Sequence, residues 1–150
     1  MARTAAAPTP ASRIAGALAI EVILAVSVAL GVGALLQVAL GAPDLASAAT
    51  ESARQLFFFM DIGLGVWAII LIVWAIRRRE VPGVGVTVIA AGVGVVANAL
   101  TVLVVSLVQG TGTVEFLTYA AQAGVAFLIA VAVVAPIIRG LFTRPVNPTA

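Results

Sequence analysis

Among the polar side chains within the apolar stretches of this chain, two carboxylates and two amides are the ones whose types could perform chemistry. They are the carboxylates Glu21 and Asp61 and the amides Asn98 and Gln122. A carboxylate among apolar residues can carry a proton, bind a cation, or donate a hydrogen bond once it is protonated. An amide offers both a donor and an acceptor and can bridge neighbouring helices. These residues are therefore the candidates for a site.

The rest of the composition narrows the classes of function. The chain has no cysteine and no histidine, which removes thiolate nucleophiles, imidazole acid–base catalysis and the usual ligands of zinc and iron. It also lacks a paired-carboxylate motif of the D-x-x-D or E-x-x-E type. We therefore expect a protein that is not an enzyme and that holds no metal and no cofactor. Its basic residues are all arginines without interleaved aromatic residues, so we expect no nucleic-acid partner.

The hydrophobic content predicts that the solvent of this chain is lipid. Of the 150 residues, 63% are hydrophobic and only 9% are charged, whereas a water-soluble domain carries about 25% charged residues. A helix that crosses the hydrocarbon core of a bilayer needs about 20 residues. The length of the chain is thus sufficient for a small number of crossings and for one compact domain.

Four apolar stretches are long enough to cross a membrane, and they are continuous rather than alternating, which favours helices over strands. The predicted spans are 14–40, 56–76, 84–108 and 116–138. We predict an all-α protein in which residues 14–138 form a single transmembrane four-helix bundle. Residues 1–13 are expected to be a mobile segment, residues 41–55 a loop, and residues 139–150 a short tail.

The positions of the arginines predict the orientation of the bundle. Arginines precede the first predicted span, follow the second, and follow the fourth; they are Arg3, Arg13, Arg77, Arg78, Arg79, Arg139 and Arg144. Because basic residues are retained on the cytoplasmic side, both termini should be cytoplasmic and the loop 41–55 should lie outside. The expected location is the inner or plasma membrane of a bacterial cell.

Asp61 lies in the segment FFFMDIGLGVW, residues 57–67, near the outer end of the second predicted span. At 1.5 Å per residue it should lie about 8 Å inside the boundary, and Asn98 and Gln122 reach comparable depths. We predict that these three side chains form an intramembrane polar cluster. The cluster could serve structure alone, or it could serve the passage of an ion or a substrate.

Glu21 is the candidate inner carboxylate, about 10 Å inside the cytoplasmic boundary. It lies in a series of small residues spaced four apart, which includes Ala17, Ala25 and Gly33 and is typical of a helix-packing seam. No basic residue falls within a predicted span, so Glu21 has no evident counter-ion. It is either a polar member of the seam or the inner end of a proton or cation path.

These observations leave two classes of function open. The first is an interaction, scaffold or accessory subunit that needs no catalytic group, with the lipid bilayer and a homo-oligomer or larger membrane complex as its partners. The second is a small homo-oligomeric transporter or channel, linked to protons or cations, that uses Glu21 and Asp61. Neither class has a diagnostic motif in this sequence.

The chain resembles the small, uncharacterised four-span membrane proteins of high-GC actinobacteria. The likeness extends over the whole chain and rests on the arginine-only basic set, the turn Arg77-Arg78-Arg79-Glu80 and the short loops. It implies a multi-pass membrane protein of bacterial origin. It implies no activity and no site residue.

Overall fold

The computed structural model describes residues 11–142, and this part of the chain consists of helices without strands. The helices are α1 (Ala11–Ala39), α2 (Leu45–Phe59), α3 (Asp61–Arg78), α4 (Val84–Gln109) and α5 (Thr113–Phe142). The all-α prediction is confirmed. Residues 11–13 and 139–142, which were expected in the flanking segments, belong to α1 and α5; the remainder of both segments lies outside the described residues.

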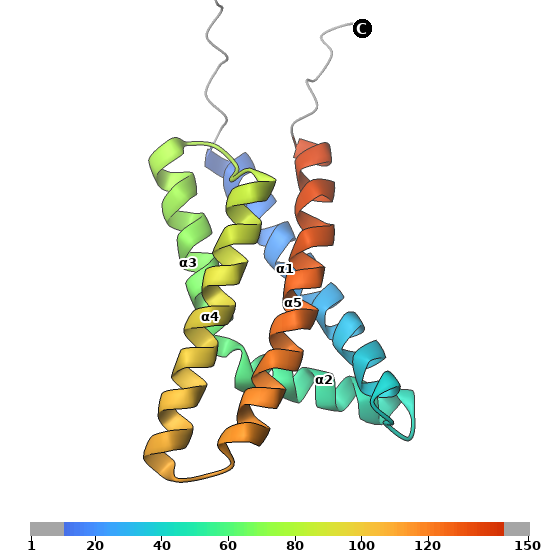
Figure 1. The fold of residues 1–150 in the computed structure, drawn as a ribbon. Coiled ribbons are helices and arrows are strands. Elements are labelled where there is room, and N and C mark those ends of the chain that lie inside the picture. The colour runs from blue at the N-terminus through green and yellow to red at the C-terminus, as the bar shows by residue number, and fades with distance from the viewer. Residues whose placement is uncertain (1–10, 143–150) are drawn as a thin grey trace, which may run out of the picture.

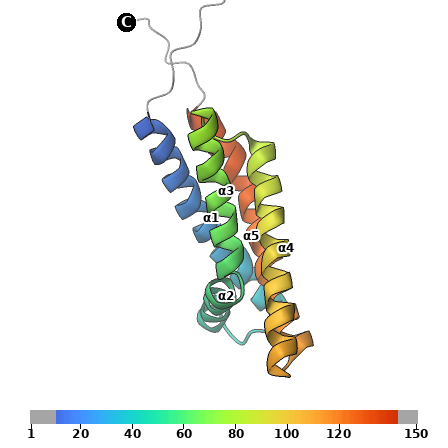
Figure 2. The same cartoon turned by 90° about the vertical axis from the view of Figure 1, so that its left-hand side faces the viewer.

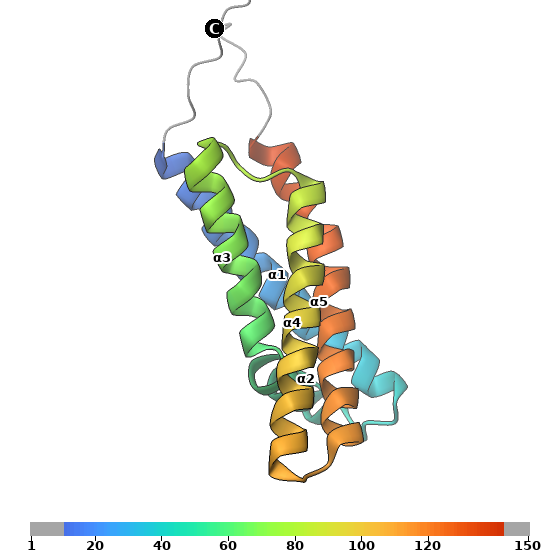
Figure 3. The same ribbon diagram turned by 60° about the vertical axis from the view of Figure 1, so that its left-hand side comes forward.

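α3, α4 and α5 run along the long direction of the molecule, α1 runs obliquely to them, and α2 runs across it (Figure 1). The start of α1, the end of α5 and the α3–α4 connection lie at one end, and the α1–α2 and α4–α5 connections lie at the opposite end (Figure 1). α4 packs between α3 and α5, and Figure 3 shows the three helices in this order. α1 packs mainly against α5 and α2. Direct contact between α1 and α3 is slight.

The lengths and the outward faces of the helices are compatible with a membrane location. α1, α4 and α5 are each long and apolar enough to cross a bilayer, and the bent pair α2 and α3 would add a fourth crossing if it counts as one span. Large apolar side chains cover the outer surface; Ile76, Ile89 and Val108, for example, are 71%, 70% and 82% exposed. Lipid can solvate such a surface, whereas water would not.

α2 corrects two predicted boundaries. The expected loop 41–55 is helical from Leu45, and the expected span 56–76 is interrupted at Met60, where α2 and α3 meet at 64° (Figure 2). α2 begins at Asp44, whose carboxylate accepts a hydrogen bond of 2.7 Å from the backbone N–H of Ser47. That bond lowers the pKa of the Asp44 carboxyl. Of the polar residues that suggested a loop, Ser47, Thr50 and Arg54 are exposed, whereas Ser52 and Gln55 are buried against the other helices.

Gly63 on α3 and Gly94 on α4 let these two helices approach each other closely, just after the break at Met60. A Cβ atom added to Gly63 would lie 2.8 Å from the carbonyl oxygen of Gly94, which is too close for any side chain. Beyond this crossing the core is filled by Trp67 and Phe127, whose rings meet edge to face with centroids 5.1 Å apart. The absence of Cβ atoms at both glycines therefore sets the distance between α3 and α4.

Candidate functional site

Glu21 is part of a buried ion pair that connects three helices. The Nη2 atom of Arg139 donates to the Glu21 carboxylate at 3.1 Å and 3.0 Å, and to the hydroxyl oxygen of Thr87 at 2.9 Å. The exposed fractions of Glu21 and Arg139 are 1% and 8%, and Thr87 is fully buried. α1, α4 and α5 are thus joined through one guanidinium group.

This ion pair corrects the expectation that Glu21 has no counter-ion. The last predicted span ends at residue 138, one residue before Arg139, but α5 continues to Phe142. Helical side chains lean toward the helix N-terminus. α1 and α5 run in opposite directions (Figure 1), so Glu21 leans toward the end where α5 stops while Arg139 leans away from it, into the bundle. The two side chains therefore converge although their positions along the helices differ.

The pairing changes what Glu21 can do chemically. A buried carboxylate whose two oxygens both accept from an arginine has that arginine as its counter-ion and is closed off from water. The two carboxylate oxygens share a single nitrogen of Arg139, which also donates to Thr87. The ion pair holds α1, α4 and α5 in register, because separating the two buried charges would leave each of them without a partner in an apolar interior.

The structure does not bring Asp61, Asn98 and Gln122 together. Asp61 is exposed, and its carboxylate accepts a hydrogen bond of 2.8 Å from the backbone N–H of Ile62 at the start of α3. Asn98 is buried, and Gln122 is half-buried on α5. Among residues 11–142, no hydrogen bond joins any two of the three. Asp61, the acid in the segment FFFMDIGLGVW, lies in the first turn of α3, where the helix dipole favours a negative charge.

Asn98 satisfies the backbone at the break between α2 and α3. Its amide nitrogen donates to the carbonyl oxygen of Phe59 at the end of α2, and its amide oxygen accepts from the N–H of Gly63 in the first turn of α3 at 3.3 Å. A break in a helix leaves such groups without partners inside the helix, and in lipid there is no water to replace them. Asn98 therefore hydrogen-bonds to the backbone on both sides of Asp61 and not to the Asp61 carboxylate.

Gln122 belongs to a different polar cluster, composed of three glutamines from three helices. The amide nitrogen of Gln37 on α1 donates to Gln55 on α2 at 3.0 Å and to Gln122 on α5 at 3.1 Å. Gln55 in turn donates to Glu51 at 3.1 Å, and Glu51 pairs with Arg54 at 2.9 Å. This cluster fastens α2 against α1 and α5. It could not be predicted while residues 41–55 were regarded as a loop.

We expect Asn98→Leu to lower the free energy of unfolding by about 1–3 kcal/mol, because two buried backbone groups lose their partners. Asp61→Asn should change it by less than about 0.5 kcal/mol, since Asp61 is exposed and asparagine is also accepted at the start of a helix. The measurement is an equilibrium unfolding titration with sodium dodecyl sulfate in mixed micelles. Equal losses in the two variants would contradict this assignment of Asn98.

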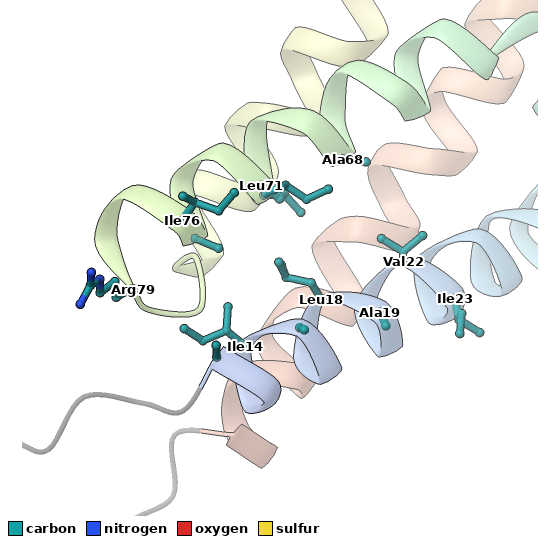
Figure 4. Close-up of a pocket in the computed structure, with 13 residues that line it drawn as sticks. Ile14, Leu18, Ala19, Val22, Ile23, Ala68, Leu71, Ile76 and Arg79 are labelled. Atoms are coloured by element: carbon teal, nitrogen blue, oxygen red, sulfur yellow. The ribbon is translucent and has the colours of Figure 1, made fainter.

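An apolar groove separates α1 from α3 at the end of the molecule where α1 begins. Its volume is about 1040 Å³. Ile14, Leu18 and Val22 line it on the side of α1, and Leu71 and Ile76 line it on the side of α3 (Figure 4). We call this feature the α1–α3 groove. It lies where the two helices have only slight contact, and among the described residues the only charged one that lines it is Arg79 at the end of α3.

The fold and these contacts define a class: an all-α protein whose apolar outer surface is compatible with a membrane and whose interior holds satisfied polar clusters. Comparison with models of protein families, with curated proteins and with solved structures found no match. Among the described residues, no group of three or more acidic residues, histidines or cysteines is arranged to hold a metal ion.

Proposed function

We propose that this chain is a non-enzymatic membrane protein of the interaction or accessory class, and that the α1–α3 groove is its binding surface. The observation that carries the proposal is the uncovered apolar volume of about 1040 Å³ between α1 and α3, two helices with only slight direct contact. The small-residue seam of α1 does not supply a free surface, because Ala17, Ala25 and Gly33 are already buried within the chain.

The placement of arginine supports an orientation in which the start of α1 and the end of α5 face the cytoplasm of a bacterial cell, so that both termini are cytoplasmic. Arg13, Arg77, Arg78, Arg79 and Arg139 all lie at or near the end where α1 begins and α5 ends (Figure 1). Positively charged residues are retained on the cytoplasmic side of a membrane. In this orientation α2 lies near the outer boundary and α3 provides the second crossing.

The alternative, a proton- or cation-linked transporter or channel, loses the features that suggested it. Glu21 is held by Arg139, which also donates to Thr87, and Asp61 is exposed at the start of α3. A path between an inner and an outer carboxylate needs both groups to be available to water or to an ion. The binding class needs neither, and it is therefore the better supported of the two.

The test of this function is flux into proteoliposomes under a pH gradient or a cation gradient. Wild type, Glu21→Gln and Asp61→Asn should all give the flux of empty vesicles, because no carboxylate path is available. Vesicles with a known proton-coupled carrier provide the positive control. Flux that exceeds that of empty vesicles and is lost in Asp61→Asn would replace the proposed function by the transporter.

The orientation has its own expected result. The chain has no native cysteine, so single cysteines can be introduced at exposed positions at the two ends, Ala46 in α2 and Glu80 in the α3–α4 connection. A membrane-impermeant maleimide should label Ala46→Cys in intact cells and should label Glu80→Cys only after the cells are opened. The reverse pattern would invert the orientation.

A further inference from the structure

We propose that the α1–α3 groove binds an acidic phospholipid of the cytoplasmic leaflet, with the acyl chains between α1 and α3 and the phosphate near Arg79. The inference rests on the proposed function, since it names the occupant of the same surface. A lipid fits this groove because its hydrocarbon tails match the apolar walls and its anionic headgroup matches the basic residue at which the walls end.

The walls of the groove suit hydrocarbon. Their deepest side chains are buried, as in the case of Leu71 and Ala75, which are 1% and 5% exposed, whereas Ile23 and Ile76 on the rims are 62% and 71% exposed. The groove therefore opens sideways, toward the region that lipid tails occupy. Figure 4 shows the side chains of α1 and α3 facing each other across it. An acyl chain can fill such a space without any hydrogen bond, because every lining side chain except that of Arg79 is apolar.

The basic end of the groove supplies charge complementarity. Arg79 lines the groove and supplies this charge, whereas Arg13, Arg77 and Arg78 lie at the same end of the molecule without lining the groove. Glu80, which is also exposed, is the one acidic residue adjacent to this set. Basic pockets between membrane helices on the cytoplasmic side are suited to acidic lipid headgroups. Arg79 and the apolar walls are thus placed to bind the headgroup and the acyl chains of one lipid molecule.

The local structure distinguishes Arg79 from its neighbours. Its backbone is left-handed, with φ of 54°, and its N–H donates to the carbonyl oxygen of Ala75 at 2.8 Å, which ends α3. Arg78 stacks instead on Trp74, with the guanidinium carbon 5.3 Å from the ring centroid. Within residues 11–142, Arg79 has no acidic partner at ion-pair distance. Its charge is therefore available to a phosphate at the mouth of the groove.

The experiment uses the full chain, purified in mild detergent, stripped of lipid and then given phosphatidylglycerol or phosphatidylcholine with identical acyl chains. Bound lipid is counted by native mass spectrometry. Wild type should prefer phosphatidylglycerol by about fivefold, the ratio that corresponds to about 1 kcal/mol for one arginine near the headgroups. Arg79→Gln should lose most of this preference. Arg77→Gln removes the same charge from a residue that does not line the groove, and it should keep the preference.

A second pair of variants tests the walls. Ala19 lines the groove, so Ala19→Phe should fill part of it and reduce the binding of both lipids. Ala132→Phe places the same side chain on an exposed position of α5, outside the groove, and should bind as wild type does. A melting temperature close to that of wild type shows that each variant is folded before its binding is counted.

Three results would overturn the inference: an unchanged preference in Arg79→Gln, an equal loss in Arg77→Gln, or wild-type binding by Ala19→Phe. An unchanged preference or an equal loss would mean that the attraction is spread over the basic end rather than held at the groove. A protein subunit that competes with lipid and is excluded by Ala19→Phe would also overturn it, while the proposed binding class would remain. Failure of the binding class itself is read from the flux assay, so the two failures are distinguishable.

Discussion

Replacing Arg139 with methionine is expected to lower the free energy of unfolding by about 3–5 kcal/mol. The substitution leaves the Glu21 carboxylate buried without its counter-ion, and removal of one member of a buried ion pair has a cost of this size. Glu21→Met should be similarly destabilising, because it leaves the arginine unpaired. The double variant should be more stable than either single variant, since two apolar side chains of similar volume replace both charges.

The measurement is a double-mutant cycle from unfolding titrations in mixed micelles, which isolates the coupling between the two residues. Arg77→Met is the matched control: the residue is exposed at the same end of the bundle, and its loss should change the free energy of unfolding by no more than about 0.5 kcal/mol. Additive losses in the double variant would show that Glu21 and Arg139 do not depend on each other, which would contradict the ion pair.

Substitution of Gly94 by alanine should be the second large effect, a loss of about 1–3 kcal/mol from overpacking. The added Cβ would meet the backbone of Gly63, including its carbonyl carbon at 3.3 Å, and backbone atoms cannot turn aside as a flexible side chain can. α3 and α4 would have to separate. The hydrogen bond of 3.3 Å between Asn98 and Gly63 would lengthen as a result.

For Gly92, on the same helix, we expect substitution by alanine to have the opposite effect on the free energy of unfolding. A Cβ at Gly92 has no atom within 4 Å, so Gly92→Ala should gain up to about 1 kcal/mol from the better helix propensity of alanine. Both variants are compared with wild type by unfolding titration and by melting temperature. A stability of Gly94→Ala equal to that of Gly92→Ala would show that the close approach of α3 and α4 is not required.

The helical class was predictable because apolar runs of this length have few other solutions in lipid. α1 and α4 begin and end within a few residues of the predicted spans. α2 was not predictable from hydropathy, since its serines, threonine and charged residues resemble a loop when only apolar content is considered. The cap at Asp44 and the buried positions Ala48, Ser52 and Gln55 carry a helical spacing that could have indicated it.

The candidate site was predicted at the level of residue types but not of partners. Depth along a span places Asp61, Asn98 and Gln122 in one layer, but it does not say which way each helix is rotated. The break at Met60 then turns Asp61 outward and presents backbone groups to Asn98. Arg139 was missed because the predicted span stopped one residue short of it. The lean of helical side chains, applied to two antiparallel helices, is the signal that could have paired it with Glu21.

The distance in sequence between Glu21 and Arg139 has a consequence for how the protein is made. The two residues are 118 positions apart, and at a synthesis rate of 5–20 residues per second this separation corresponds to about 6–24 seconds. In the proposed membrane location, the first helix would enter the bilayer carrying an acid whose partner has not yet been translated. Final assembly of the bundle has to await the last helix, and until then the nascent chain is an intermediate with an unmatched charge.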